Sequence, residues 1–176
     1  LVLKLVKCGF KVTVLSLNLP ADEKKIDGVE YWRADITNFE QLQKQLLVTT
    51  FDYVINLSGY IDHCQFMEGG RQIIDTHFGG VQNLLQLLDW TSIKRFVQIG
   101  TSDEYGGLPP PQTEKMRENP ISPYSFGKVA STQLLQMLTR TEGFPAVILR
   151  PFLVYGEGQN SRRFLPQIVR GCLQGS

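Results

Sequence analysis

The chain has 176 residues, of which 42% are hydrophobic and 20% charged, as expected for a globular protein with one main core. Its formal net charge is +1 and no long basic run occurs, which argues against nucleic acid or an anionic membrane surface as the main partner. No apolar run reaches the roughly 18 residues of a membrane span. Cys8, Cys64 and Cys172 suggest neither a metal pair nor a disulfide framework, so we expect a reducing, cytoplasmic environment.

The first third of the chain alternates strands and helices. Apolar residues at helical spacing predict helices at 1–9 and 38–47, with Thr37 or Asn38 as the cap of the second helix. Short runs rich in β-branched and aromatic residues predict strands at 11–17, 29–35 and 51–59. The chain starts without methionine and inside a helical pattern, so we expect a strand and a turn upstream of Leu1.

The remainder continues the alternation. We expect a helix at 68–89, a strand at 94–102, a proline-rich loop at 106–114 and a strand at 145–156 that passes into a loop. The helix at 122–143 has the clearest ends. Ser122 can cap it, Pro123 suits its first position, and Gly143 can close it.

The fold class follows from this order and from the strands, which are nearly all apolar, as strands covered on both faces are. The pattern predicts an α/β fold with a doubly wound parallel sheet. Ligands bind such sheets at the carboxyl ends of the strands. Those ends carry the small or polar residues Ser16, Asp35, Ser58, Gly59, Thr101, Ser102, Arg150 and Pro151.

Tyr124 and Lys128, in the stretch "SPYSFGK", are four residues apart and therefore share one helix face. A free tyrosine titrates near pH 10, and a nearby ammonium lowers that pKa. With the hydroxyl of Thr101, the pair could relay a proton to and from a carbinol oxygen during hydride transfer. The alternative is a packed tyrosine followed by a solvated lysine.

Five segments in the correct order resemble the extended short-chain dehydrogenase/reductase family, and specifically its NAD(P)-dependent sugar-nucleotide epimerases and dehydratases. The segments cover nearly the whole chain and read "RADITN", "VINLSGY", "IGTSDEYG", "SPYSFGK" and "ILRPFLVYGEGQ". The resemblance implies a Rossmann-type fold with a partial NAD(P)-binding domain at 1–155 and the start of a truncated substrate-binding domain at 156–176. A nucleotide sugar would be the substrate, and the helices at 68–89 and 122–143 would form a homodimer.

The resemblance also assigns roles to single residues. Tyr124 would be the general acid/base, Lys128 its partner and ribose anchor, and Thr101 the hydrogen-bond partner of the reacting oxygen. Asp103 could be the base of a 4,6-dehydration, whereas Ser102 is no strong acid, so epimerisation and dehydration both stay open. The alternative is that Asp103 and Glu104 are ordinary loop carboxylates. The cofactor would contact Ser16, Asp35, Ile36, Leu57, Ser58, Gly59, Tyr124, Lys128 and Pro151.

The sequence departs from this family in three places. No GxxGxxG phosphate loop occurs, so the first strand and that loop should lie upstream, and the chain alone is expected to be inactive. Ser16 stands where an acid is usual in NAD-preferring relatives, and Asp22 or Glu23 could replace that acid. Lys24 or Lys25 could instead meet a 2′-phosphate, so NAD and NADP are both candidates.

The third departure is His77, which replaces a structural asparagine, and we expect it to be packed rather than catalytic. His63 and Cys64 lack a third ligand, so no metal is proposed. Arg162 and Arg163 could bind a diphosphate, or could simply be solvated. Two rival functions remain: a reductase of the same family, and a Rossmann module that binds nucleotide without catalysis.

Overall fold

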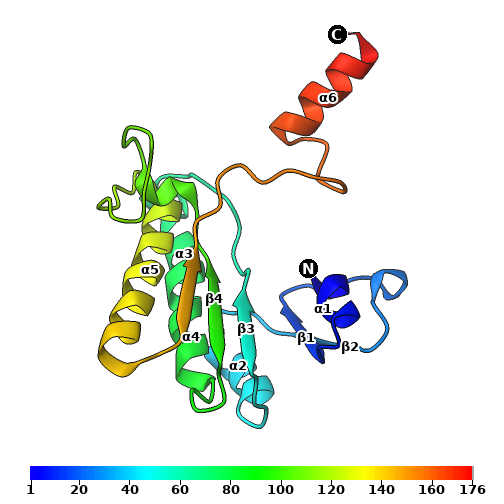
Figure 1. Ribbon diagram of the computed structural model, residues 1–176, viewed down its shortest axis with the longest axis vertical. Helices are drawn as coiled ribbons and strands as arrows, with labels where there is room; N and C mark the ends of the chain where they lie inside the picture. The colour runs from blue at the N-terminus through cyan, green and yellow to red at the C-terminus, as the bar shows by residue number, and fades with distance from the viewer. Residues whose placement is uncertain (176) are drawn as a thin grey trace.

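The computed structural model describes residues 1–175 and is built of parallel strands with flanking helices (Figure 1). The strands of this part are β1 (Val12–Ser16), β2 (Val29–Arg33), β3 (Tyr53–Asn56), β4 (Arg95–Ile99) and β5 (Ala146–Leu149). The α-helices are α1 (Val2–Lys7), α2 (Phe39–Leu46), α3 (Gly70–Ile74), α4 (Gly80–Leu87), α5 (Pro123–Glu142) and α6 (Phe164–Gln174). The predicted α/β class with parallel strands and a Rossmann-type arrangement is thereby confirmed.

The strands form two separate sheets. One contains β1 and β2, the other has the order β3-β4-β5, and every pairing is parallel. No ladder of hydrogen bonds joins the two sheets within residues 1–175, and Figure 1 shows β1 and β2 standing apart from the edge of β3. Phe10 packs edge-on against Tyr53 of β3, with ring centroids 5.8 Å apart, and so links the two parts. The parallel pairing predicted for the strands is confirmed in both sheets.

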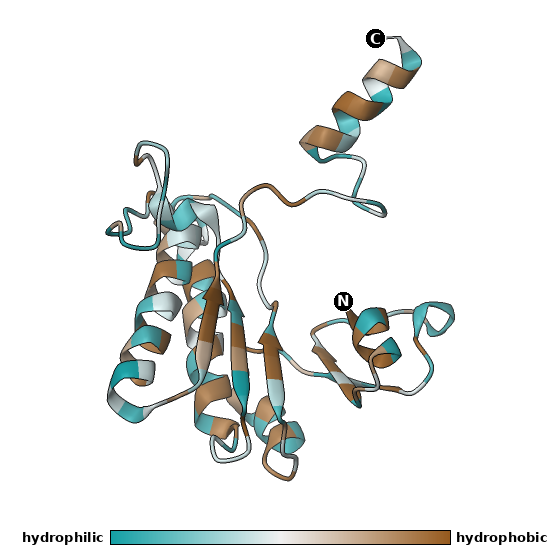
Figure 2. Cartoon of the chain, in the orientation of Figure 1, coloured by the Kyte–Doolittle hydropathy of each residue, from teal (hydrophilic) through white to brown (hydrophobic). Residues whose placement is uncertain are grey.

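The main core lies between the three-stranded sheet and the helices beside it. Phe96 of β4 is fully buried, together with Leu135 of α5 and Phe144 after that helix. The rings of Phe96 and Phe144 are 5.6 Å apart. Figure 2 shows the matching pattern, with apolar strands and helices that carry polar residues on their outer sides. Burial of these side chains is the main force that holds α4 and α5 against the sheet.

Helix α5 ends where its sequence predicts. The Ser122 hydroxyl accepts a hydrogen bond from the Ser125 backbone N–H at 3.1 Å, and Pro123 occupies the first turn. Gly143 closes the helix with φ +68°, a left-handed conformation that glycine adopts without strain. The expected single helix at 68–89 is instead interrupted. A π-helical turn at Asp75–Gly79 separates α3 from α4, and such turns are frequent at functional sites.

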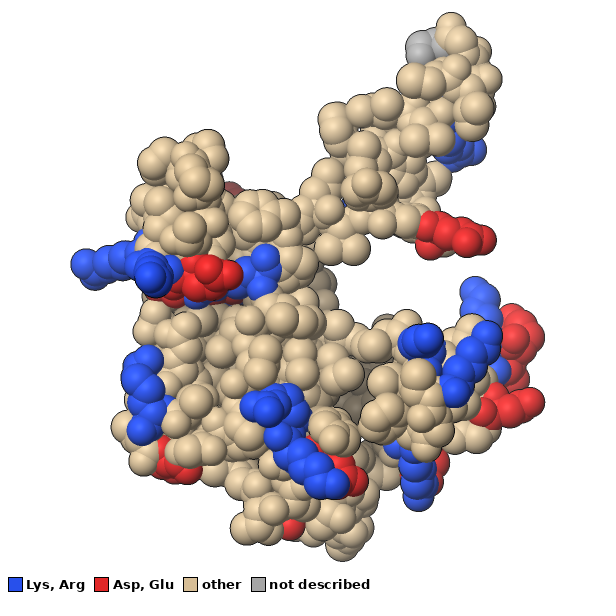
Figure 3. Space-filling view, viewed as in Figure 1, with Lys and Arg blue, Asp and Glu red and all other residues tan. Residues whose placement is uncertain are grey.

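The chain after β5 extends away from the sheet and ends in α6 (Figure 1). Phe164, Val169 and Leu173 of that helix are exposed. In the face drawn in Figure 3, basic and acidic side chains are interspersed, without a large patch of one sign. Cys8, Cys64 and Cys172 are free thiols. No helix within residues 1–175 combines the length and the apolar character needed to cross a membrane.

Candidate active site

Three residues of α5 share one face of the helix at intervals of four: Tyr124, Lys128 and Thr132. All three are buried. The Lys128 ammonium donates a hydrogen bond to the backbone oxygen of Ile99 at 2.8 Å. Since Ile99 is the last residue of β4, this face of α5 is directed at the carboxyl end of that strand. The structure therefore brings the predicted Tyr124–Lys128 pair to the predicted edge of the sheet.

Thr101 is separated from β4 by Gly100 alone and caps a short 3₁₀ helix, Ser102–Tyr105. Its hydroxyl accepts a hydrogen bond from the Asp103 backbone N–H at 3.2 Å, and its own N–H donates to Glu104 Oε1 at 3.0 Å. This reciprocal arrangement is a capping box, which fixes the backbone of the turn. The Ser102 N–H also donates to the Pro151 carbonyl at 3.2 Å. The Thr101 side chain is thus held in one place between β4 and the end of β5.

Glu104 is not a solvated loop carboxylate, which was one interpretation of the sequence. It is fully buried and forms an ion pair with Arg150, whose Nε donates to Glu104 Oε2 at 2.8 Å. Arg150 also contacts Glu118 and donates to the Tyr105 hydroxyl at 3.2 Å. A buried ion pair with these additional hydrogen bonds leaves few polar atoms uncompensated. The network ties the turn after β4 to β5 and to the proline-rich loop.

Tyr124 is enclosed by aromatic rings. His77 lies edge-on to it with centroids 5.0 Å apart, and His63 does the same at 5.5 Å. Burial raises the pKa of Tyr124 above its usual value, while hydrogen bonding by Thr101 acts in the opposite direction. The net shift of this pKa is upward, because burial and the carboxylates of Asp103 and Glu104 outweigh the Thr101 hydrogen bond and the charge of Arg163. The role of Lys128 as partner of Tyr124 stays a prediction. Burial likewise lowers the pKa of Lys128 to about 8, against the attraction of Glu104.

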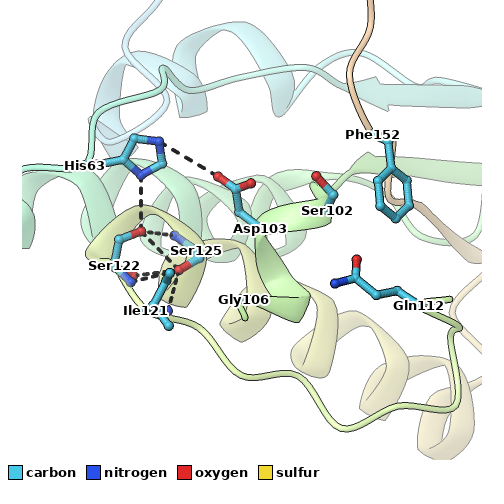
Figure 4. A pocket seen from close by; sticks show the side chains of 9 residues that line it. All are labelled: His63, Ser102, Asp103, Gly106, Gln112, Ile121, Ser122, Ser125 and Phe152. Carbon is cyan, nitrogen blue, oxygen red and sulfur yellow. Dashed lines mark hydrogen bonds and ion pairs between the residues drawn. The ribbon is translucent and has the colours of Figure 1, made fainter. Parts of the chain in front are cut away.

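A cavity of about 290 Å³ opens next to the turn after β4 and the start of α5 (Figure 4). Thr101 and Tyr124 do not line it, but His63 on its wall packs against Tyr124. Ser102, Asp103 and His63 face it from one side, and Gln112 and Phe152 from another. The Asp103 carboxylate lies 3.9 Å from His63 Nε2. The cavity therefore offers a carboxylate, an imidazole and hydroxyl groups within reach of the same ligand. Thr101, Asp103, Tyr124 and Lys128 remain predictions as catalytic residues, and the structure gathers all four around this region.

The residues predicted to meet a cofactor lie at the carboxyl ends of the strands, but several already have partners. The Ser16 hydroxyl donates to the Asn18 carbonyl at 2.9 Å. The Asp35 carboxylate accepts hydrogen bonds from the N–H and hydroxyl of Thr37, at 2.9 and 2.8 Å. Ile36 is buried, and its carbonyl accepts from the Asn83 side chain. Ser16 would have to give up this bond in order to donate to a nucleotide, whereas Asp35 Oδ2 can accept a further bond while Oδ1 keeps Thr37.

At the end of β3, Leu57 is exposed, and the Ser58 hydroxyl donates to Asn56 Oδ1 at 2.6 Å. Gly59 has φ +108°, and a Cβ atom placed there would come within 2.1 Å of the His77 ring. This glycine therefore makes room for His77. The close approach explains why a small residue follows Ser58 here, without any reference to a ligand.

Arg162 and Arg163 lie on the extended segment before α6 and are exposed. Neither belongs to the cavity beside Asp103. Among the described residues, no three His, Cys, Asp or Glu side chains gather in positions that could hold a metal ion. Sequence reasoning considered His63 only as a metal ligand and missed its place on the cavity wall. It also missed the buried pair Glu104–Arg150, although Thr101-x-x-Glu104 has the spacing of a capping box.

A doubly wound parallel α/β fold, with a tyrosine and a lysine on one helix at the carboxyl end of a central strand, defines the class of Rossmann-type nucleotide-binding proteins. Within that class, the model of the NAD dependent epimerase/dehydratase family matches residues 1–176. The chain belongs to this family. The resemblance identified from the sequence is thereby confirmed, and so is the dependence on a nicotinamide cofactor at the level of the family.

Similar proteins include both kinds of enzyme. The chain is 29% identical over 134 residues to UDP-glucuronate 4-epimerase of Thermodesulfobacterium geofontis, covering 76% of this chain and 42% of that protein. It is 25% identical over 184 residues to dTDP-glucose 4,6-dehydratase of Haemophilus influenzae, covering 94% and 54%. The crystal structure of UDP-glucuronic acid 4-epimerase from Bacillus cereus in complex with NAD superposes with a TM-score of 0.79 at 21% identity, covering 99% and 58%. The chain spans about half the length of the curated relatives.

Proposed function

We propose that the whole protein catalyses the NAD(P)-dependent epimerisation or 4,6-dehydration of a nucleotide-activated sugar through a transient ketone. Tyr124 is the acid/base in this proposal. The observation that carries it is the meeting of Thr101, Tyr124 and Lys128 at the carboxyl end of β4, next to a turn whose Asp103 lines a cavity. The family and the two enzyme activities among the relatives support the same choice.

The roles follow from the positions of the side chains. The phenol of Tyr124 exchanges a proton with the sugar hydroxyl while the carbinol carbon is oxidised or reduced. Thr101, fixed by its capping box, offers a hydroxyl to the same oxygen. Lys128, one helical turn after Tyr124 on α5, supplies the positive charge of the site. Asp103 is the candidate base for removing a proton next to the ketone, the step that separates dehydration from epimerisation.

The residues fit the nicotinamide half of the cofactor better than the rest of it. When bound, the nicotinamide ring accepts a hydride from the carbinol carbon and later returns it. Lys128 uses one of its three N–H donors on Ile99, so two remain for a ribose. Tyr124, Lys128 and Pro151 would hold this half. Leu57, Ser58 and Gly59 would lie beside it, and Ser16, Asp35 and Ile36 would meet the adenosine.

We further infer that residues 1–155 form a partial cofactor domain and that 156–176 begin a substrate-binding domain. The bend of the chain away from the sheet after β5 supports this boundary (Figure 1). The segments 68–89 and 122–143 are proposed to form a homodimer contact, and the exposed side chains of Phe126 and Met137 on α5 suit that use. The three free thiols agree with a cytoplasmic location.

The proposal is tested by incubating the whole protein with a panel of nucleotide hexoses and trace NAD or NADP, followed by mass spectrometry. Loss of water identifies a dehydratase, and an isomer of unchanged mass identifies an epimerase. Stoichiometric consumption of added NAD(P)H identifies a reductase instead. Bound cofactor without any product favours a binding module and contradicts the proposal.

Tyr124→Phe tests the assigned acid/base. The variant should retain cofactor binding and lose turnover by at least about 100-fold, the usual contribution of a positioned proton donor. Tyr53→Phe is a matched control, because Tyr53 is half exposed on β3. Turnover near that of the unmodified protein in Tyr124→Phe would exclude the proton-relay assignment.

A further inference from the structure

Four charged side chains are buried around the turn that follows β4. Glu104 and Lys128 are almost inaccessible, and the side chains of Arg150 and Glu118 are less than a tenth exposed. Two are anions and two are cations, so the group balances as a whole. Arg150 contacts both carboxylates, whereas Lys128 forms no ion pair with any carboxylate among residues 1–175. The buried Lys128 ammonium is thus stabilised by a carboxylate with which it is not in direct contact.

Glu104 connects the elements that carry the proposed proton-transfer residues. Its Oε1 accepts from the Thr101 backbone N–H at 3.0 Å. Its Oε2 accepts from the Thr132 hydroxyl at 2.9 Å and from Arg150 Nε at 2.8 Å. These bonds reach the turn after β4, the α5 face of Tyr124 and Lys128, and the end of β5. A carboxylate that accepts three hydrogen bonds from three separate elements constrains their relative positions.

Lys128 and Glu104 approach the same short backbone segment. The ammonium is bound to the carbonyl of Ile99, and the carboxylate is bound to the N–H of Thr101, two residues further on. Gly100 lies between them, and a Cβ atom placed there would come within 2.3 Å of Glu104 Oε1. Thr132, one helical turn after Lys128, holds the other carboxylate oxygen. Opposite charges so arranged in a dry environment interact strongly.

We propose that Glu104 is a positioning residue of the proton-transfer site: it fixes Thr101 against α5 and supplies the negative charge that keeps the buried Lys128 ammonium protonated. Burial draws the pKa of Lys128 down to about 8, and the charge of Glu104 opposes this. Without that charge, Lys128 would be partly neutral at physiological pH, and the site would lose its buried positive charge. The inference rests on the proposed function, because it takes Tyr124 and Lys128 as the working pair.

The test is a pH titration of Lys128 monitored by NMR. It uses ¹³C- and ¹⁵N-labelled lysine in the whole protein, without substrate or cofactor. Lys128→Met identifies which resonance belongs to Lys128. In Glu104→Gln, the titration midpoint of Lys128 should fall from about 8 to about 7 or lower, a tenfold or larger change in its protonation equilibrium. The alkaline limb of the pH–rate profile should move with it. Since the titration needs no turnover, its failure is distinguishable from a failure of the proposed function.

Glu118→Gln is the matched control. It also removes one carboxylate from Arg150, but Glu118 contacts neither Thr101 nor α5 face residues at positions 124, 128 and 132. It should leave the Lys128 midpoint unchanged, even if it destabilises the fold as much as Glu104→Gln does. An unchanged midpoint in Glu104→Gln, or equal shifts in both variants, would overturn the proposal.

Each single variant leaves Arg150 with one carboxylate, so both are expected to fold. If Glu104→Gln does not fold, the double variant Glu104→Gln/Arg150→Met removes the ion pair together, which is better tolerated than leaving one buried charge alone. Its Lys128 midpoint should lie below that of Arg150→Met alone, since these two variants differ only in the charge of Glu104. Equal midpoints in these two variants would show that Glu104 does not sustain the ammonium.

Discussion

Lowering the pH from 7 to 5 should destabilise the protein through His77. The ring is buried and its Nε2 lies 2.9 Å from the Tyr60 carbonyl oxygen. Because a carbonyl can only accept, Nε2 must carry the hydrogen, and the lone pair of Nδ1 has no partner in the part of the chain described. Burial lowers the pKa of His77 from 6.5 to about 4, and the charge of Lys128 acts in the same direction. The folded protein therefore resists protonation at a position where the unfolded chain accepts it.

The sign and size of the effect follow from linkage. Between pH 6.5 and about 4 the unfolded state binds more protons at His77 than the folded state does, so stability falls as the pH falls through this window. From pH 7 to pH 5 the loss is about 2 kcal/mol. With a urea m-value of about 2 kcal/mol per molar, the midpoint should move by about 1 M.

The assay is urea unfolding of the whole protein at pH 7 and pH 5, compared with His77→Gln. The variant removes the titrating ring. Between pH 7 and pH 5 its urea midpoint should therefore move by about 1 M less than that of the unmodified protein. His63 is the second of the two histidines and is exposed, so His63→Gln should keep the pH dependence of the unmodified protein. Equal pH dependence in His77→Gln and the unmodified protein would refute the reasoning about the buried ring.

Two further predictions concern the turn and the cavity. Gly106→Ala should destabilise the protein by about 1–3 kcal/mol in the same urea assay, because φ is +56° and the new Cβ would lie 2.0 Å from the Asn119 carbonyl oxygen. Gly107→Ala is the control and should have little effect, because nothing lies within 4 Å of its new Cβ. Similar losses of stability in both variants would contradict the steric argument. Asp103→Asn should abolish loss of water while oxidation at the carbinol carbon continues, as measured by product mass and by cofactor absorbance; unchanged dehydration would remove Asp103 from the proposed chemistry.

Local sequence patterns predicted those helix ends that are determined by the capping residues themselves. Ser122, Pro123 and Gly143 mark the ends of α5, and the structure places the helix between them. The π-helical turn at 75–79 could not be predicted, because the apolar spacing continues across it and only the pair Gly79–Gly80 hints at a change. The local pattern also does not tell which strands pair within each of the two sheets. Strand pairing is a long-range property that periodicity along one strand does not report.

The part of the candidate site that lies on a single helix could be predicted from the sequence. The spacing of Tyr124 and Lys128 puts both on one face regardless of the rest of the fold. The contact of His77 with Tyr124 depends on how the π-helical turn crosses α5. It requires Gly59 to leave room for the His77 ring and Gly127 to leave room for the His77 Cβ. Such complementarity between distant segments is visible only once they are packed.

The surroundings of Tyr124 also decide in which form it meets a substrate. Burial raises its pKa, and the nearby carboxylates of Asp103 and Glu104 raise it further, so the phenol is protonated at neutral pH. In this form it can donate a proton to a ketone without any further change. In the proposed mechanism the tyrosine as it stands is therefore the acid. A positive charge brought close to the phenol would lower its pKa again and favour its proposed use as a base.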